Sequence, residues 1–371
     1  MLDVSINFQQ NIMIKVVTYN VLSDALFNSN DKTLTNENRF NSLNDKLVDL
    51  MCNDIIICLQ EMSFDWYNQL NPLFIEFGYH FVYKSYGSKS DGFMGVGIAY
   101  PLTHYQLKEQ IVQKVTELKE WSSSDDTDIV NAMNRADIHN YTNWECIIKE
   151  SLVLIPLIIF CNYLFNTTFL YSSLLYFSYM YQFVNVNTDA VYNAYNRCKN
   201  KSNVLIGLKL EIVTEKSDES SSYEWPIAEQ FWVFTYHMPF EFNEDIIMVT
   251  HASLVKSHIE KIAEDQPFIL CIDLNASSSD SAYKLLIDGT YDDNVFSTYP
   301  INDQYRPTSS DCNWSDCNWT NVKYTVSSEL NNGDTLKERI DYIFVNDGMK
   351  LIDIYQPSDH FPIYANLCIN T

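Results

Sequence analysis

The chain has 371 residues, of which 46% are hydrophobic and 14% aromatic, and its formal net charge at pH 7 is −24. This composition excludes an intrinsically disordered protein, and the length allows one large core or two ordinary ones. The acidic charge argues against nonspecific binding to a phosphate backbone, which depends on Lys and Arg. It does not argue against a nuclease, because carboxylates that bind divalent cations contribute to the same charge.

The nine cysteines include no C-x-x-C pair, which disfavours a zinc ribbon and a disulfide framework. Several of them lie within apolar runs, where cysteine behaves as a small buried hydrophobe. We therefore expect a reducing compartment. Residues Met1 to Gln10 lack the basic-then-apolar pattern of a secretory signal, so the expected location is cytoplasmic.

Strands and helices alternate in the first third of the chain. Strands are predicted at Ile12–Tyr19, Asp54–Gln60, Tyr79–Tyr83 and Gly95–Tyr100. A helix is predicted over Arg39–Met51, where apolar residues recur at helical spacing, and another around Trp66–Phe77. This alternation predicts an α/β protein whose sheet is covered by helices.

The same alternation returns towards the C-terminus. Strands are predicted at Asn203–Val213, Phe231–Tyr236, Phe268–Ile272, Arg339–Val345, Leu351–Tyr355 and Ile363–Leu367. Helices are predicted within Asp245–Ala263 and from Ser281 to Ile287. We expect the His and Lys residues of the first of these helices to lie on a solvated outer face, and Leu107–Trp121 fits either a strand or a helix.

The middle of the chain departs from this pattern. Between Glu150 and Asp189 there is no charged residue, and 147–186 is rich in Leu, Ile, Phe and Tyr. Each half is too short or too polar for a clean membrane span of about 20 apolar residues. Three interpretations stay open: a hairpin that contacts a membrane or a partner, an insertion buried against the fold, and low-complexity sequence without a function.

The stretch Pro267–Asn275 is the centre of the functional hypothesis. Its apolar run ends at Asp273 and Asn275, which point to the same side of an extended chain because they are two residues apart. A rigid strand that ends in a carboxylate and a carboxamide, followed by a polar loop, suits catalysis or binding. The competing interpretation is an Asp that caps its own turn.

Further polar residues stand at the ends of the other predicted strands. The full set comprises Asn20, Glu61, His237, Asp273, Asn275, Asp341, Asp359 and His360. Carboxylate and amide oxygens are the ligands that Mg²⁺ prefers, histidines suit proton transfer, and Asn and His side chains can donate hydrogen bonds to a phosphoryl oxygen. Metal-assisted phosphoester hydrolysis is the reaction class that uses all of these groups.

The order of short motifs resembles that of the endonuclease/exonuclease/phosphatase superfamily. The motifs are T-Y-N-V-L-S-D at 18–24, L-Q-E at 59–61, Y-H-M-P at 236–239, D-L-N at 273–275, R-I-D-Y at 339–342 and S-D-H-F-P at 358–362. The N-V-L-S-D continuation, the R-I-D-Y-I-F strand and the S-D-H-F-P ending are most similar to the deadenylase, nocturnin and 2′-phosphodiesterase type of exonuclease. The motif Y-H-M at 236–238 departs mildly from the T-H-L that is common in the family, and it keeps the histidine, His237.

The resemblance implies a four-layer α/β sandwich of two packed mixed β-sheets flanked by helices, formed by one domain over residues 12–371 with 147–186 as a hydrophobic insertion. It implies Mg²⁺, with Mn²⁺ as an alternative, bound by Glu61, Asn20 and Asp359. The implied general base is His360, oriented by Asp341. The resemblance further implies that Asp273 positions the attacking water, and that Asn275 and His237 stabilise the transition state.

The expected function is a Mg²⁺-dependent 3′-exoribonuclease that acts on poly(A) or a similar RNA. No basic cluster for an RNA backbone stands out, and Arg197 and Asn203 are the best candidates for a substrate contact. The alternative is a phosphodiesterase or phosphatase on a small or lipid substrate, of the sphingomyelinase or inositol-phosphatase kind, which the acidic charge and the tract 147–186 favour. A non-catalytic binding module is a third hypothesis, and it predicts missing catalytic groups. The sequence leaves the oligomeric state open.

Overall fold

A computed structural model describes the parts of the chain on which the fold and the candidate site rest. The described residues are 13–27, 35–119, 121, 196–213, 229–241, 245–290, 320–321, 328–329, 335–336, 341–355 and 363–369. The chain divides into two compact units. The first comprises Met1–Lys119, Lys201–Tyr291 and Cys312–Thr371, and the second comprises Glu120–Asn200 and Asp292–Asp311.

The second unit contributes few described residues, and the two six-stranded sheets and the candidate site belong to the first unit. The predicted hydrophobic insertion, 147–186, lies outside the described residues. The domain boundaries proposed from the sequence therefore stay predictions. Among the helices that are described, none is both long enough and apolar enough to cross a membrane.

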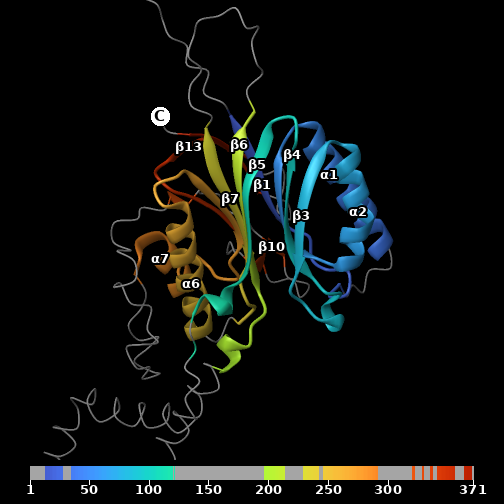
Figure 1. Cartoon of the computed structure of the whole chain (residues 1–371). Helices are drawn as coiled ribbons and strands as arrows, with labels where there is room; N and C mark the ends of the chain where they lie inside the picture. Colours follow the sequence, from blue (N-terminus) through green and yellow to red (C-terminus); the bar gives the residue numbers. More distant parts are fainter. Residues whose placement is uncertain are drawn as a thin grey trace, which may run out of the picture. The chain divides into compact units, whose positions relative to one another are not determined.

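The first unit is built on two six-stranded sheets (Figure 1). The strand order of the first sheet is β13 (Met349–Tyr355), β14 (Ile363–Ile369), β1 (Ile14–Asn20), β2 (Ile56–Met62), β4 (Gly95–Pro101) and β3 (Tyr79–Ser85). The strand order of the second is β5 (Tyr105–Lys114), β6 (Val204–Ile212), β7 (Gln230–His237), β8 (Phe268–Asp273), β12 (Asp341–Val345) and β9 (Thr320–Asn321). A short pair, β10 (Ser328–Glu329) and β11 (Thr335–Leu336), forms a third, two-stranded sheet.

Each six-stranded sheet contains one parallel pair at its centre, and its other pairs are antiparallel. The parallel pairs are β1 with β2 and β7 with β8. Parallel neighbours require a crossover connection, and a helix supplies it in both cases. Helix α1 (Asn36–Cys52) lies between β1 and β2 in the chain, and α6 (Asp245–Ala263) lies between β7 and β8.

The helices cover the outer faces of the two sheets. Helix α1 and helix α2 (Phe64–Glu76) bury Leu43, Leu47 and Trp66 in a core that they share with β1 to β4. Helix α6 packs on the second sheet together with α7 (Ser281–Asp288), where His251 Nδ1 lies 2.8 Å from Tyr236 Oη of β7. The predicted four-layer α/β sandwich is confirmed by this arrangement.

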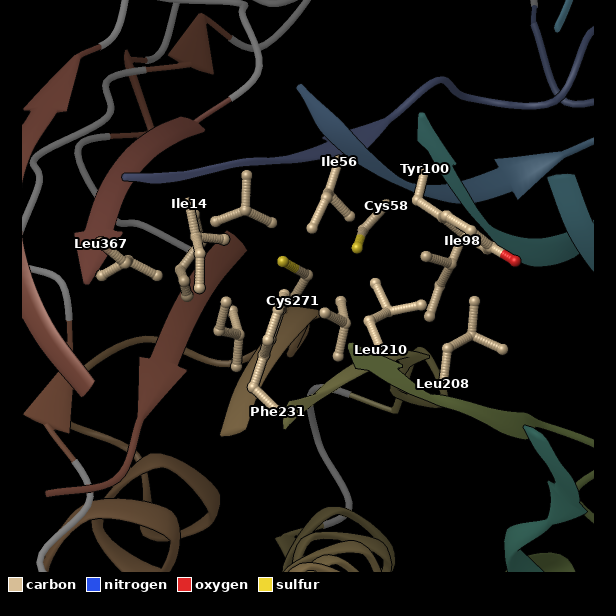
Figure 2. Close-up of a cluster of buried hydrophobic side chains, with 14 of the residues drawn as sticks. Ile14, Ile56, Cys58, Ile98, Tyr100, Leu208, Leu210, Phe231, Cys271 and Leu367 are labelled. Atoms are coloured by element: carbon tan, nitrogen blue, oxygen red, sulfur yellow. The ribbon is translucent and has the colours of Figure 1, made fainter. Parts of the chain in front are cut away.

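The main core lies between the two sheets. It contains inward-facing residues of both, such as Ile98 and Cys58 from the first and Leu208 and Cys271 from the second (Figure 2). The sulfur atoms of Cys58 and Cys271 face each other across this layer, and both residues are free thiols without exposed surface. Both therefore act as the small buried hydrophobes expected from the sequence.

The expectation for the His and Lys residues of α6 is wrong for two of them, while Lys261 is exposed as expected. His251 and Lys256 are fully buried instead of lying on a solvated face. Lys256 Nζ donates to the carbonyl oxygen of Leu286 in α7 at 2.7 Å and lies 3.3 Å from Glu260 Oε1. Because α6 is covered by both the sheet and α7, the side chains of His251 and Lys256 find their partners inside the protein.

The segment that fitted either a strand or a helix contains both. Residues 105–114 form β5, which pairs with β6, and a short 3₁₀ helix (Val115–Leu118) follows it. The first residue of that helix, Val115, is buried, and its backbone N–H donates to the carbonyl oxygen of Asn203 at 3.1 Å. This bond ties the end of β5 to the segment that precedes β6.

Candidate active site

Polar side chains from both sheets meet where the two central parallel pairs end. Asn20 is the last residue of β1, and His237 and Asp273 are the last residues of β7 and β8. His237 and Asp273 also lie opposite each other in the strand register. Asp341 begins β12, which runs antiparallel to β8, so it lies opposite Asp273 at the same edge. The register therefore brings His237, Asp273 and Asp341 to one edge of the second sheet, and the packing of the two sheets brings Asn20 to the same rim.

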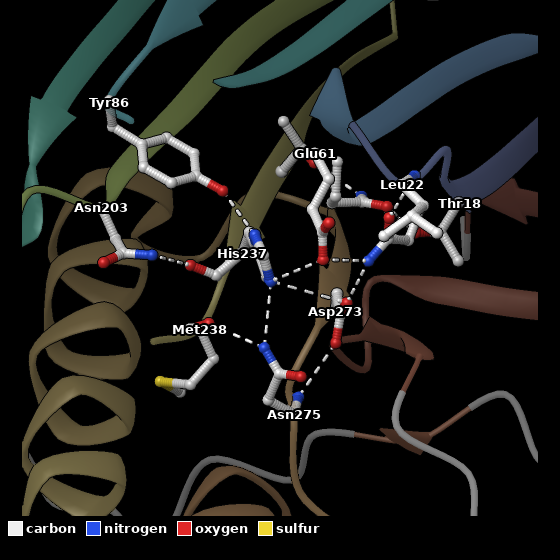
Figure 3. A network of polar contacts seen from close by, with 12 residues as sticks. Thr18, Leu22, Glu61, Tyr86, Asn203, His237, Met238, Asp273 and Asn275 are labelled. Carbon is white, nitrogen blue, oxygen red and sulfur yellow. Dashed lines mark hydrogen bonds and ion pairs between the residues drawn. The ribbon is translucent and has the colours of Figure 1, made fainter. Parts of the chain in front are cut away.

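Glu61 lies inside β2, one residue beyond the predicted strand end at Gln60. The pairing of β2 with β4 shifts register between Leu59 and Met62, and Glu61 has a φ of 55°. A non-glycine residue in this left-handed region costs on the order of 1–3 kcal/mol, and such residues cluster at functional sites. Irregular pairing of this kind re-aims a side chain, and here Glu61 turns towards the rim (Figure 3).

Asn20 connects the two sheets. Its Nδ2 donates to Glu61 Oε1 at 2.8 Å and to Asp273 Oδ2 at 2.6 Å. Its Oδ1 accepts a hydrogen bond from the backbone N–H of Leu22 at 2.9 Å, which fixes the orientation of the amide. Asn20 thus presents a donor to the carboxylates, and binding a cation through Oδ1 would require the amide to leave Leu22.

Asp273 fits both interpretations from the sequence, because it caps the turn that leads to Asn275 and also faces the site. Asp273 Oδ1 accepts from the backbone N–H of Asn275 at 3.0 Å, which is the turn-capping contact. The other oxygen, Oδ2, faces Asn20 and His237. Asn275 lies beyond the end of β8 with a φ of 50°, and its Nδ2 donates to the carbonyl oxygen of Met238 at 2.9 Å.

His237 is buried at the centre of the group (Figure 3). Its Nε2 lies 3.0 Å from Asn275 Nδ2, 3.5 Å from Glu61 Oε1 and 3.6 Å from Asp273 Oδ2. Its other ring nitrogen, Nδ1, makes a short contact with the hydroxyl of Tyr86, which follows β3. The Nε2 atom is therefore the one that can reach a ligand at the rim.

The site concentrates negative charge. Burial raises the pKa of Asp341 well above its ordinary range, and the nearby carboxylates of Asp273 and Glu61 raise it further. Glu61 Oε2 and Asp341 Oδ1 are buried without a hydrogen-bond partner among the described residues. A buried carboxylate oxygen without a partner lowers the stability of the folded protein unless it binds a proton or a cation.

The residues present fit a divalent cation. One ligand atom each of Glu61, His237 and Asp273 lies within 4.8 Å of the others. Carboxylate oxygens suit Mg²⁺ and Mn²⁺, and a neutral imidazole nitrogen is a further ligand for the transition metals. A possible metal-binding cluster is therefore present, and the donor set leaves the choice of ion open.

A buried hydrogen-bond network lies directly beneath the rim. Gln60, which has no exposed surface, places its Nε2 3.1 Å from Thr18 Oγ1 in β1 and 3.0 Å from Thr235 Oγ1 in β7. Thr18 Oγ1 also lies 3.3 Å from Gln60 Oε1. Because Gln60 precedes Glu61 and Thr235 lies two residues before His237, this network joins the two sheets immediately next to the site.

Six of the residues proposed from the sequence come together in the described part of the first unit. The six are Asn20, Glu61, His237, Asp273, Asn275 and Asp341. Asn203 is buried, and its Nδ2 donates to the backbone oxygen of His237 at 2.8 Å, so here it supports the site from behind. Arg197 belongs to the second unit, and Asp359 and His360 lie outside the described residues. The chemical roles assigned to all ten stay predictions.

Sequence reasoning missed Tyr86 and the role of Gln60. Tyr86 follows the last residue of β3 and so had the same signal as the other candidates, a polar group directly after a strand. A tyrosine next to a glycine also suits an ordinary turn, so the sequence alone does not single out Tyr86. Gln60 was assigned to the apolar strand, and only the packing of the two sheets reveals its partners.

Comparisons with known proteins concern the family and the fold. Residues 17–140 match the model of the Endonuclease/Exonuclease/phosphatase family. A comparison with curated proteins gave no match. Among solved structures, ANGEL2, a 2′,3′-cyclic phosphatase, in complex with adenosine-2′,3′-vanadate is similar with a TM-score of 0.57 and 14% identity, over 98% of this chain and 97% of that chain. The human Nocturnin catalytic domain with bound sulfate is similar with a TM-score of 0.51 and 13% identity, over 97% and 96% of the respective chains.

These likenesses lie far below the identity at which activity transfers between proteins, so the solved structures establish the fold. Together with the family match, they confirm the resemblance to the endonuclease/exonuclease/phosphatase superfamily that the motifs indicate. Members of the family whose model matches residues 17–140 hydrolyse phosphoester bonds, which agrees with the expectation of such an enzyme. Dependence on a divalent cation is typical of that family, and the cluster of Glu61, His237 and Asp273 is consistent with it.

Proposed function

We propose that this chain, which has the fold and over residues 17–140 the sequence pattern of the endonuclease/exonuclease/phosphatase family, is a Mg²⁺-dependent 3′-exoribonuclease of the deadenylase type. The observation that carries the proposal is the meeting of Asn20 and Glu61 from one sheet with His237 and Asp273 from the other. Such a cluster suits metal-assisted phosphoester hydrolysis, and the motif subtype argues for RNA.

Glu61 and Asp273 would hold the cation, with Asn20 beside them. Asn20 Nδ2 donates to Glu61 Oε1 at 2.8 Å and to Asp273 Oδ2 at 2.6 Å, so the two carboxylates lie close together without a cation. A bound divalent cation would offset charge on a phosphoryl oxygen and acidify the water that it binds. Asp359, assigned by the resemblance, would add a further ligand.

His237 and Asn275 would bind the phosphoryl group. The two side chains approach each other at His237 Nε2 and Asn275 Nδ2, which lie 3.0 Å apart, and once the His237 ring is protonated both can donate to one oxygen that develops charge. Asn275 is held by its bond to the backbone oxygen of Met238, so its donor is fixed in advance. His360, again by resemblance, would take the proton from the attacking water.

The proposal is tested by a substrate panel with the full chain in Mg²⁺ and in chelator. The panel contains oligo(A), mixed RNA, RNA that ends in a 2′,3′-cyclic phosphate, DNA, nucleotides and sphingomyelin. The cyclic phosphate is included because ANGEL2 is named as a 2′,3′-cyclic phosphatase. The proposal requires stepwise shortening of oligo(A) from its 3′ end that stops in chelator.

Two variants locate the activity. Glu61→Gln removes a charge from the site and should abolish the Mg²⁺-dependent activity. Glu76→Gln removes the same charge from an exposed position in helix α2 and should leave the activity unchanged. Activity on oligo(A) that persists in Glu61→Gln would place the reaction elsewhere, and cleavage of another phosphoester with no action on oligo(A) would reject the RNA substrate.

A phosphodiesterase or phosphatase that acts on a lipid or small molecule is the second candidate. The formal charge of −24 favours it, because a strongly acidic protein repels an RNA backbone, and so does the apolar tract 147–186. Flotation with liposomes, using the chain with and without 147–186, separates the candidates. The lipid proposal requires binding that is lost when the tract is deleted.

A further inference from the structure

Tyr86 contacts His237 at Nδ1, the ring nitrogen opposite the one that approaches Glu61 and Asp273. It stands directly after β3, is half-buried, and its hydroxyl makes a short contact with His237 Nδ1 (Figure 3). The two ring centroids are 6.0 Å apart and the ring planes are inclined by 64°, an edge-on arrangement. Tyr86 belongs to the first sheet's side of the unit and His237 to the second sheet, so this contact also crosses between the sheets.

The hydrogen bonds of Asn275 indicate where the proton of a neutral His237 lies. Asn275 Nδ2 is 2.9 Å from the carbonyl oxygen of Met238, which can only accept, so the nitrogen of this amide faces Met238. The same nitrogen lies 3.0 Å from His237 Nε2. A donor at this distance requires a lone pair on Nε2, and the single proton of the neutral ring must then be on Nδ1.

We propose that Tyr86 is a positioning residue of the proposed phosphoesterase, which accepts the Nδ1 proton of His237 and thereby keeps Nε2 facing the reaction site. The inference rests on the proposed function for its catalytic consequence, and on geometry alone for the position of the proton. The histidines of metal sites use an outer partner in this way, because the partner fixes both the tautomer and the orientation of the ring.

Both members of the pair are held in place by neighbouring backbone contacts. Ser202 Oγ donates to the backbone oxygen of Tyr86 at 2.7 Å, and Asn203 Nδ2 donates to the backbone oxygen of His237 at 2.8 Å. The backbone N–H of Tyr86 donates to the carbonyl oxygen of Met94 at 3.0 Å. Two adjacent residues before β6 therefore set the spacing between tyrosine and histidine, which makes the contact a preorganised one.

The arrangement gives Nε2 a different role in each state of the ring. In the neutral ring Nε2 accepts from Asn275 Nδ2 and lies 3.5 Å from Glu61 Oε1 and 3.6 Å from Asp273 Oδ2, so a cation that bound to this lone pair would replace the bond to Asn275. In the protonated ring Nε2–H can donate to a phosphoryl oxygen while Nδ1–H stays bound to Tyr86. Burial, followed by the carboxylates of Glu61 and Asp273, raises the pKa of Tyr86 well above its ordinary range, so its hydroxyl stays neutral throughout.

The position of the proton is measured by ¹⁵N NMR of the full chain labelled at histidine, with and without Mg²⁺, over a pH series that identifies the neutral ring. The His237 resonances are assigned by their loss in His237→Asn. We expect a protonated Nδ1 and an unprotonated Nε2 in the wild-type protein. A neutral ring with its proton on Nε2 would overturn the proposal without any variant of Tyr86.

The role of Tyr86 is measured with Tyr86→Phe. Tyr79→Phe is the matched control, because Tyr79 Oη donates to the backbone oxygen of Ile55 at 3.1 Å, at the opposite end of β3. Tyr86→Phe should give a mixture of both ring tautomers and lower kcat by about 10–100-fold with KM unchanged. Tyr79→Phe should change neither.

A His237 spectrum in Tyr86→Phe that equals the wild-type spectrum would refute the positioning role, and so would a loss of activity caused only by a higher KM. If the chain hydrolyses no phosphoester, the proposed function fails, and the two spectra still decide whether Tyr86 sets the tautomer. The two failures are therefore distinguishable.

Discussion

Replacing Gln60 by Leu should destabilise the protein strongly, although the two side chains are similar in size. Gln60 is fully buried and contacts Thr18 Oγ1 and Thr235 Oγ1 at 3.1 and 3.0 Å. Losing two hydrogen bonds of about 0.5–1.5 kcal/mol each, and leaving two buried hydroxyls with an unmet bond, gives a cost of about 2–5 kcal/mol. The free energy of unfolding is measured by urea denaturation, in chelator so that metal binding does not contribute.

A double-mutant cycle with Thr235→Val isolates the bond between the sheets. Gln60→Leu alone leaves the Thr235 hydroxyl without its partner, whereas the double variant removes both groups. The double variant should therefore be more stable than the sum of the two single variants predicts, by about 1 kcal/mol or more. The position of Glu61 depends on its neighbour, so the remaining folded protein should also lose activity.

Gln69→Leu is the control for this series. Gln69 lies on the exposed side of α2, where its Nε2 lies 3.3 Å from the backbone oxygen of Asp65. Its replacement should change the free energy of unfolding by about 0.5 kcal/mol at most. The reasoning is refuted if Gln60→Leu costs no more than Gln69→Leu, or if the cycle with Thr235→Val is additive.

Three further predictions concern charge. Glu61→Gln should stabilise the metal-free protein, since it removes one of the repelling carboxylates. It should also abolish the rise in Tm that Mg²⁺ causes in the wild type. That rise corresponds to a stabilisation of about 2.7 kcal/mol for a ligand at 100 times its Kd. Asp341 holds its proton more tightly when folded than at its ordinary pKa of 3.8, so its contribution to stability is present at low pH and lost as pH rises through the folded pKa. The Tm of metal-free Asp341→Asn should therefore fall less with rising pH than that of the wild type, and equal slopes would contradict this. Lys256→Met leaves Glu260 in α6 without its ion-pair partner at 3.3 Å and should cost about 3 kcal/mol in urea denaturation, whereas a neutral result would show that the pair contributes nothing.

The strands and most of the site follow from patterns that are local in the sequence. The apolar run before Asp273 and the run before His237 each carry a strand signal, and the residue at each end is the one that reaches the rim. The side chains of Asp341 and Asp273 then meet because antiparallel pairing of two such strands leaves little choice of register. Which residues lie at the rim could thus be inferred from the residue type and its place at the end of an apolar run.

The features that the sequence did not predict depend on partners far away in the chain. Lysine is a residue type that usually lies on the surface, and the burial of Lys256 follows from the packing of α7 on α6. The role of Tyr86 depends on the approach of β7 to the end of β3, two strands of different sheets. The left-handed conformation of Glu61 arises from irregular pairing between β2 and β4, which no pattern within β2 specifies.

The division of the site between two sheets explains why so many hydrogen-bonding side chains lie at their junction. The distance between Glu61 and His237 is set by how closely the sheets pack, because the two residues have no shared strand. Apolar packing between the sheets is non-directional and could tolerate a small slide of one sheet against the other. The hydrogen bonds of Gln60, Asn20 and Tyr86 each cross the junction and each require a defined geometry. They fix the relative position of the sheets to within the tolerance of a hydrogen bond, which is the precision that a phosphoryl-binding site requires.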